Sequence, residues 1–112
     1  MRHTLTSLVA CMLACGCAGT SFHAAQLTQA GVIRLAEPEN TSYTHRFYIR
    51  SARDYGTGYD TMNTSDRHLL IKGYLGASCT RIAIVSETFL PAGGKRLDGI
   101  EDGTYVCRVV CN

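Results

Sequence analysis

Apolar and polar residues alternate in two segments near the middle of the chain, and this alternation predicts β-strands. The first segment covers residues 31–36 (GVIRLA) and the second covers residues 43–51 (YTHRFYIRS). In the second, the apolar residues face one side of a sheet, and Arg46, Tyr48 and Arg50 face the other. We therefore expect one apolar and one polar face on the first pair of strands.

Two further strands are predicted in the last third of the chain. Residues 81–89 (RIAIVSETF) are rich in β-branched side chains, which favour a strand. Residues 104–111 (TYVCRVVC) are apolar on both faces except at Arg108. A strand that is apolar on both faces is typical of the middle of a sheet. Residues 95–100 could add a short strand, and Asp102 with Gly103 forms a dipeptide that favours a hairpin turn.

Residues 68–75 (HLLIKGYL) are compatible with two structures. Residues 64–66 could cap a short helix here, although Gly73 and Gly76 would limit it to about two turns. The alternative is a buried strand, since such a strand need not alternate. The preceding residues 54–66 are rich in Gly, Asp, Asn, Ser and Thr, and predict a long surface loop.

These elements predict a mainly β fold with five or six short antiparallel strands and at most one short helix. A small barrel or a sandwich is the architecture that such a set of strands usually forms.

The first residues have the pattern of an export signal. Arg2 gives a charged start, residues 5–14 are almost entirely apolar or small, and small residues follow. The apolar run is shorter than the roughly 20 residues that a membrane-spanning helix needs. We expect residues 1–18 to be an export leader, residues 19–30 a tether, and residues 31–112 a single small β domain.

The end of this leader, residues 13–20 (LACGCAGT), resembles the lipobox of bacterial lipoproteins. The resemblance implies acylation at Cys15 or Cys17 and a lipid anchor in a periplasm-facing membrane. Ordinary signal-peptidase cleavage, after Ala18 or after Ala25, is the alternative and would give a secreted protein.

The remaining cysteines predict a disulfide. Cys107 and Cys111 are four residues apart on one strand, about 13 Å when extended, whereas the Cα atoms of a disulfide lie within about 7 Å. If the last two long strands pair symmetrically about their connection, Cys79 lies opposite Cys111. We expect a Cys79–Cys111 bond, with Cys107 buried in its strand or, as an alternative, bonded to Cys17; a shifted register would give Cys79–Cys107 instead.

Charge and motifs exclude several functions. The chain has eleven basic residues including Arg2, which leaves ten in the remainder, against nine acidic residues. This balance gives no excess charge for binding nucleic acid. The sequence has no catalytic motif, and its spacing of histidines and cysteines does not suit a metal. We expect no enzymatic activity, no metal and no cofactor.

Two groups of residues are candidates for ligand binding. Arg46, Tyr48 and Arg50 place two guanidinium groups beside a phenol ring, which could bind a carboxylate-bearing sugar or an acidic partner. Pairing with a neighbouring glutamate (Glu37, Glu39 or Glu87) would explain the arginines equally well. Tyr55 and Tyr59 lie on the long loop, where they could contact a ligand or fold back onto the sheet.

The order of these elements resembles the B subunits of pertussis- and subtilase-type toxins. The segments that carry the resemblance are residues 59–62 (YDTM), 81–84 (RIAI) and 107–111 (CRVVC). It implies an exported OB-fold module that binds glycans as an oligomer. The long helix expected before the strand at residue 81 is missing or shortened.

The sequence therefore predicts a small exported protein of the cell envelope, a lipoprotein with a binding or structural role toward an unknown protein or glycan. One alternative is the glycan-binding oligomeric module. The other is a small secreted enzyme inhibitor or immunity-type protein.

Overall fold

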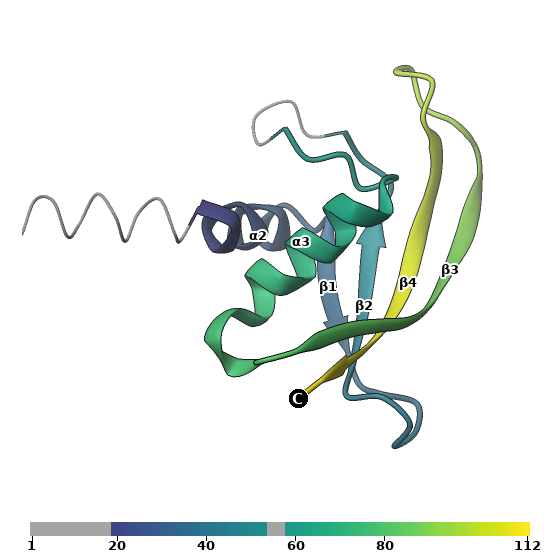
Figure 1. Ribbon diagram of the computed structural model, residues 1–112. Helices are drawn as coiled ribbons and strands as arrows, with labels where there is room; N and C mark the ends of the chain where they lie inside the picture. The colour runs from purple at the N-terminus through teal and green to yellow at the C-terminus, as the bar shows by residue number, and fades with distance from the viewer. Residues whose placement is uncertain (1–18, 54–57) are drawn as a thin grey trace, which may run out of the picture.

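The computed structural model describes residues 19–53 and 58–112 and contains two helices and four strands (Figure 1). Along the chain these are α2 (Gly19–Gln29), β1 (Ile33–Ala36), β2 (His45–Arg50), α3 (Thr64–Leu75), a 3-10 turn (Gly76–Ser78), β3 (Ile82–Lys95) and β4 (Glu101–Cys111). Within these ranges, no helix is both long enough and apolar enough to cross a membrane.

The strands form one antiparallel sheet in the order β1-β2-β4-β3. Both helices lie on the same side of this sheet and pack against each other (Figure 1). The fold is mainly β, as predicted, but it is a single four-stranded sheet covered by two helices. The prediction of a five- or six-stranded barrel or sandwich with at most one helix was wrong in these respects.

One missing strand is explained by the β3–β4 hairpin. β3 continues beyond Pro91 as far as Lys95, and the chain turns only at Arg96, whose N–H bonds to the carbonyl of Ile100. The dipeptide Asp102-Gly103, predicted to be the turn, therefore lies inside β4. The prediction that the last strand is central was correct, because β4 lies between β2 and β3.

The ambiguous segment is a helix of three turns. Asn63 caps its start by accepting a hydrogen bond from the backbone N–H of Ser65, and Gly76 ends it. Gly73 lies within the helix and does not shorten it. Its lack of a side chain allows a close contact between α3 and α2. A Cβ at this position would lie 2.7 Å from the backbone oxygen of Thr20 in α2.

Residues 19–30, expected to be a tether, mostly form helix α2. Ala24 and Leu27 are buried on its inner side and belong to the hydrophobic core. The sequence of this helix, GTSFHAAQLTQ, has little amphipathic pattern. The sequence therefore did not predict a helix with a buried side here.

The core lies between the sheet and the two helices. Phe47 and Ile49 from β2 are fully buried there together with Leu70 and Ile71 from α3. The ring of Phe47 meets that of Tyr74 edge-on at 5.1 Å. This packing confirms that the apolar residues of the 43–51 segment share one face.

The predicted disulfide between Cys79 and Cys111 is present, with a Cα–Cα distance of 5.4 Å. The predicted register was less accurate, since Cys107 lies opposite Glu87 and not near Ala83. Two irregularities in the β3–β4 pairing, between Ile84 and Ser86 and near the tip of the hairpin, account for the shift. Cys107 is free and buried, as expected.

Candidate functional site

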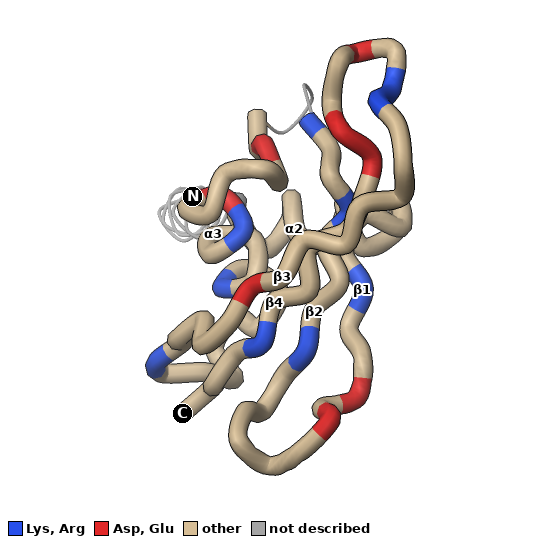
Figure 2. Tube along the Cα trace, turned by 90° about the vertical axis from the view of Figure 1, so that its right-hand side faces the viewer, with Lys and Arg blue, Asp and Glu red and all other residues tan. Residues whose placement is uncertain are grey.

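The face of the sheet away from the helices, here called the open face, is rich in arginine. Since Phe47 points toward α3, its neighbours Arg46 and Tyr48 point to the opposite side. Arg34 of β1 pairs with Tyr48, and Arg108 of β4 pairs with Arg46 in the register of the sheet. Figure 2 looks onto this side and shows basic residues on the neighbouring strands β1, β2 and β4.

Tyr48 lies at the centre of this cluster. The guanidinium carbon of Arg34 lies 4.9 Å from the centroid of the Tyr48 ring, and that of Arg46 lies 5.5 Å from it. Both distances are typical of cation–π contacts. The ring is therefore already occupied by two cations, and it holds their side chains on the open face.

One half of the cluster is closed by an acidic residue from the β1–β2 loop. Glu39 Oε1 accepts a hydrogen bond from Arg108 Nε at 2.8 Å, and its ion-pair distances are 2.7 Å to Arg108 Nη2 and 3.3 Å to Arg46 Nη1. The hydrogen bond from Arg108, followed by one from Tyr43, lowers the pKa of Glu39 below its ordinary value. Glu39 is therefore an anion at neutral pH.

The other half of the cluster is more accessible. Arg34 is exposed and has no acidic partner within the described ranges. Arg50 forms an ion pair with Asp102, with 3.7 Å between Arg50 Nε and Asp102 Oδ1. A shallow hollow of about 200 Å³ opens here, lined by Gly31, Val32, Arg34, Tyr48, Arg50 and Thr104. The open face thus carries four arginines against two acidic partners, Glu39 and Asp102.

Arg46, Tyr48 and Arg50 thus lie together, but Tyr59 of the long loop does not join them. The ring of Tyr59 lies 5.4 Å from that of His23 in α2, and its hydroxyl lies 3.4 Å from Thr20 Oγ1. Tyr59 therefore folds back onto a helix. Tyr55 lies outside the described residues, as do Cys15 and Cys17.

Arg34 and Arg108 are the site residues that sequence reasoning missed. The alternation of residues 31–36 indicated the face of Arg34 within its own strand. The sequence does not reveal the register of the sheet, which brings Arg34 of β1 and Arg108 of β4 beside the residues of β2. Of the three glutamates considered as partners, Glu39 pairs with Arg46, and Glu87 pairs elsewhere.

Glu87 lies on the covered face, where it pairs with the buried Arg67 of α3. The pair has two hydrogen bonds, from Arg67 Nε to Oε1 at 2.9 Å and from Nη2 to Oε2 at 2.7 Å. Arg67 Nη1 also donates to the Thr61 carbonyl at 2.8 Å, and the guanidinium lies 3.9 Å from the centroid of the Tyr105 ring. These contacts saturate Arg67, so its role is structural.

Cys107 adjoins this ion pair, with its Sγ 3.5 Å from Glu87 Oε1. Burial, reinforced by the charge of Glu87, raises the pKa of the Cys107 thiol to about 12. The thiol is therefore protonated at neutral pH and is a poor nucleophile.

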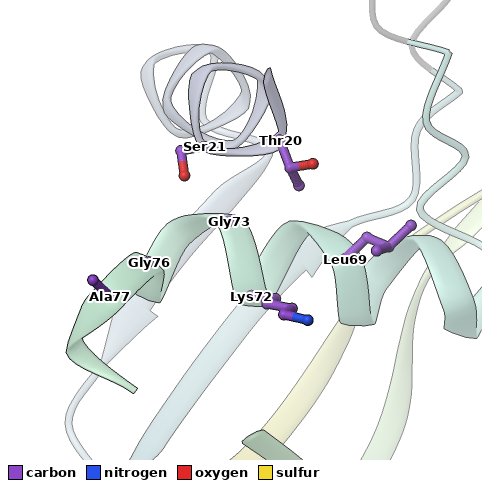
Figure 3. A pocket seen from close by; sticks show the side chains of 7 residues that line it. All are labelled: Thr20, Ser21, Leu69, Lys72, Gly73, Gly76 and Ala77. Atoms are coloured by element: carbon purple, nitrogen blue, oxygen red, sulfur yellow. The ribbon is translucent and has the colours of Figure 1, made fainter. Parts of the chain in front are cut away.

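A second hollow, of about 380 Å³, lies where α2 crosses α3 (Figure 3). Its lining residues are Thr20, Ser21, Leu69, Lys72, Gly73, Gly76 and Ala77. Among the described lining residues, Lys72 is charged and Thr20 and Ser21 carry hydroxyl groups. Over residues 19–53 and 58–112, no cluster of three or more His, Cys, Asp or Glu residues could hold a metal ion.

Comparison with protein families, curated proteins and solved structures gives no match to this chain.

Proposed function

We propose that this chain is an exported, non-catalytic binding protein whose open face holds an acidic segment of a partner protein. The observation that carries the proposal is the excess of arginine on that face. Two guanidinium groups, of Arg34 and Arg46, contact the Tyr48 ring, and Arg50 and Arg108 lie on the same face. Among the described residues, two acidic side chains pair with these four arginines. Arginine is well suited to this role because its planar fork can bind a carboxylate through two hydrogen bonds.

The accessible half of the face would make the first contact. Arg34 is exposed and is held over Tyr48, so it offers its guanidinium edge to the solvent. Arg50 contacts Asp102 only loosely, at 3.7 Å, and the two side chains are partly exposed. An exposed ion pair of this kind contributes little free energy, so a partner carboxylate could replace Asp102 at low cost.

The shape of the face favours a protein partner over a sugar. Ligand pockets for small molecules usually exceed about 300 Å³ and enclose most of the ligand. The hollow beside Arg34 is smaller, about 200 Å³, and the arginines are spread over three strands. The ring of Tyr48 is covered by guanidinium groups and that of Tyr59 packs on α2, which leaves neither available for sugar stacking.

The proposed location is the cell envelope. The leader-like residues 1–18 support export, and acylation at Cys15 or Cys17 would anchor the chain to a periplasm-facing membrane. The Cys79–Cys111 disulfide is compatible with an oxidising compartment. Cleavage after Ala18 would give a secreted form that keeps both α2 and the open face, whereas cleavage after Ala25 would remove most of α2 and the buried Ala24.

The test is binding of a fluorescent peptide rich in Asp and Glu, followed by anisotropy at low salt. The double variant Arg34→Gln/Arg50→Gln should weaken binding by about tenfold or more, since two charge-assisted contacts are lost. Lys72→Gln is the control for the single variant Arg34→Gln, because each removes one positive charge and Lys72 lies on the exposed surface of α3. It should change the affinity by less than about twofold, as a distant charge is screened.

Two results would overturn this assignment. One is equal weakening by Lys72→Gln, which would indicate unspecific attraction. The other is tight binding of an oligogalacturonate with no binding of the peptide, which would indicate a carboxylate-bearing sugar as the ligand.

A second candidate function is the glycan-binding, oligomeric module implied by the resemblance to toxin B subunits. The observation that favours it is α3, since twelve helical residues precede β3 where the resemblance calls for a long helix. Light scattering coupled to gel filtration tests it directly. A ring-sized assembly would support this candidate, and a monomer would reject it.

A further inference from the structure

Glu39 makes an unusual set of contacts for a residue in an exposed loop. Its Oε1 atom accepts hydrogen bonds from Arg108 Nε and the Tyr43 hydroxyl. It also forms ion pairs with Arg108 Nη2 and with Arg46 Nη1, which lies 3.3 Å away. All recorded contacts of this carboxylate fall on one oxygen. The Glu39 side chain is nevertheless 44% exposed, so solvent reaches the group that bridges two arginines.

The two arginines are only partly satisfied by this single oxygen. Arg46 Nε is buried and has no hydrogen-bond partner within the described part of the chain. A carboxylate that approached with both oxygens could bind the pair more completely, as in the bidentate geometry that arginine prefers. Glu39 therefore fills this position without exhausting its capacity to bind an anion.

The loop has a backbone anchor besides the contacts of the Glu39 carboxylate. The backbone N–H of Glu39 donates to the Tyr43 hydroxyl at 2.7 Å, and the Tyr43 side chain is buried. The side chain of Glu39 can therefore leave the arginines while the backbone stays anchored. The carboxylate is thus a separate, replaceable contact.

We infer that Glu39 acts as an internal competitor, occupying Arg46 and Arg108 until a carboxylate of the acidic partner replaces it. This inference rests on the proposed function and divides the open face into two parts. Arg34 and Arg50 form the accessible part, and Arg46 and Arg108 form the part that Glu39 blocks. Such a competitor lowers the apparent affinity, because only the fraction of molecules with Glu39 displaced can use the second part.

The experiment measures the affinity for the same acidic peptide in Glu39→Gln. Removing the competing charge should tighten binding by about tenfold, the effect of freeing a site that is mostly occupied. Glu37→Gln is the matched control: it removes the same charge from the same loop, and Glu37 is exposed with no contact recorded among the described residues. It should tighten binding by less than about twofold, because only the screened long-range attraction changes.

Two further variants separate competition from a general change in charge. Arg108→Gln added to Glu39→Gln should abolish the gain, because the freed site then lacks its main cation. Glu39→Asp keeps the charge but withdraws the carboxylate from Arg108, so it too should bind more tightly than the wild type. It also covers the case in which Glu39→Gln folds poorly.

The outcomes distinguish this inference from the proposed function. If the wild type binds the peptide and Glu39→Gln gains no more than Glu37→Gln, the competitor role is rejected and the binding face stands. A gain that survives the Arg108 substitution would also reject it. If neither the wild type nor any variant binds the peptide, the proposed function fails, and the competitor role fails with it.

Discussion

The arginine side chains on the two faces of the sheet differ in burial and in pairing. On the covered face Arg67 is nearly buried, with 5% of its side chain exposed, and has two hydrogen bonds to Glu87 as well as a backbone acceptor and an aromatic ring. On the open face Arg34 is exposed and has only the ring of Tyr48 as a recorded contact among the described residues.

This difference shows which cations serve folding and which are available to a ligand. A buried charge must be paired, because an unpaired charge in the core costs several kcal/mol. An exposed charge needs no partner and adds little to stability. Arg67 on the covered face therefore has its guanidinium group fully engaged, whereas Arg34 on the open face keeps its hydrogen-bonding capacity.

The substitution Arg67→Met is the strongest test of this difference between the two faces. The substitution leaves Glu87 partly buried without its cation, so we expect a loss of about 3–5 kcal/mol in the free energy of unfolding. Urea denaturation measures it. The double variant Arg67→Met/Glu87→Leu should recover most of the loss, since it removes both charges. A cost below about 1 kcal/mol for Arg67→Met would contradict the structural role of the pair.

Gly73→Ala tests the packing of the two helices that cover the sheet. The added Cβ would lie 2.7 Å from the Thr20 backbone oxygen, so α2 must shift. We expect a loss of about 1–3 kcal/mol in stability, together with faster amide exchange in α2. Lys72→Ala is the neighbouring control on α3, and should stay within about 0.5 kcal/mol of the wild type because Lys72 is exposed. Equal effects would argue against this close contact.

Acid should weaken the covered face through Glu87. The hydrogen bond from Arg67 lowers the pKa of Glu87 in the folded state, so its stabilising effect is complete above pH 4.5, the ordinary value, and is lost as the pH falls through the lowered pKa. Unfolding of the wild type and of Glu87→Gln, compared at pH 7, 4 and 3, should give a stability difference that shrinks with acid. A difference independent of pH would mean that the charge of Glu87 does not matter.

The smallest expected effect on stability is that of Arg34→Gln on the open face. We expect the free energy of unfolding to change by no more than about 0.5 kcal/mol, since the side chain is exposed and lacks a buried partner. Thermal or urea unfolding beside Arg67→Met completes the comparison. A loss of several kcal/mol would show that Arg34 serves folding after all, and would remove the main reason to consider it a ligand contact.

Much of the sheet could be predicted from local patterns. Alternation in residues 43–51 correctly assigned Arg46, Tyr48 and Arg50 to one face, and the spacing of Cys107 and Cys111 correctly argued against a bond between them. Both inferences depend on strand geometry, which has a fixed period of two residues. The predicted Cys79–Cys111 bond is present, although the register from which it was predicted differs from that of the structure.

The rest depends on contacts between distant segments. Helix α2 is held by tertiary packing of Ala24 and Leu27, and its own sequence has almost no amphipathic signal. The pairing of Arg67 with Glu87 joins residues 20 positions apart, and Glu39 meets Arg108 across 69 positions. No periodicity in the sequence could reveal these partners, because only the register and the helix placement bring them together.

The central claim is that the open face, and not the helical side, binds an acidic partner. A titration of ¹⁵N-labelled protein with the Asp- and Glu-rich peptide, followed by NMR, tests it residue by residue. We expect shift changes in the arginine Nε–H signals of Arg34, Arg46, Arg50 and Arg108 and in the amides of β1, β2 and β4, with the signals of Arg67 unchanged. Changes confined to α2 and α3, or to Arg67, would contradict it.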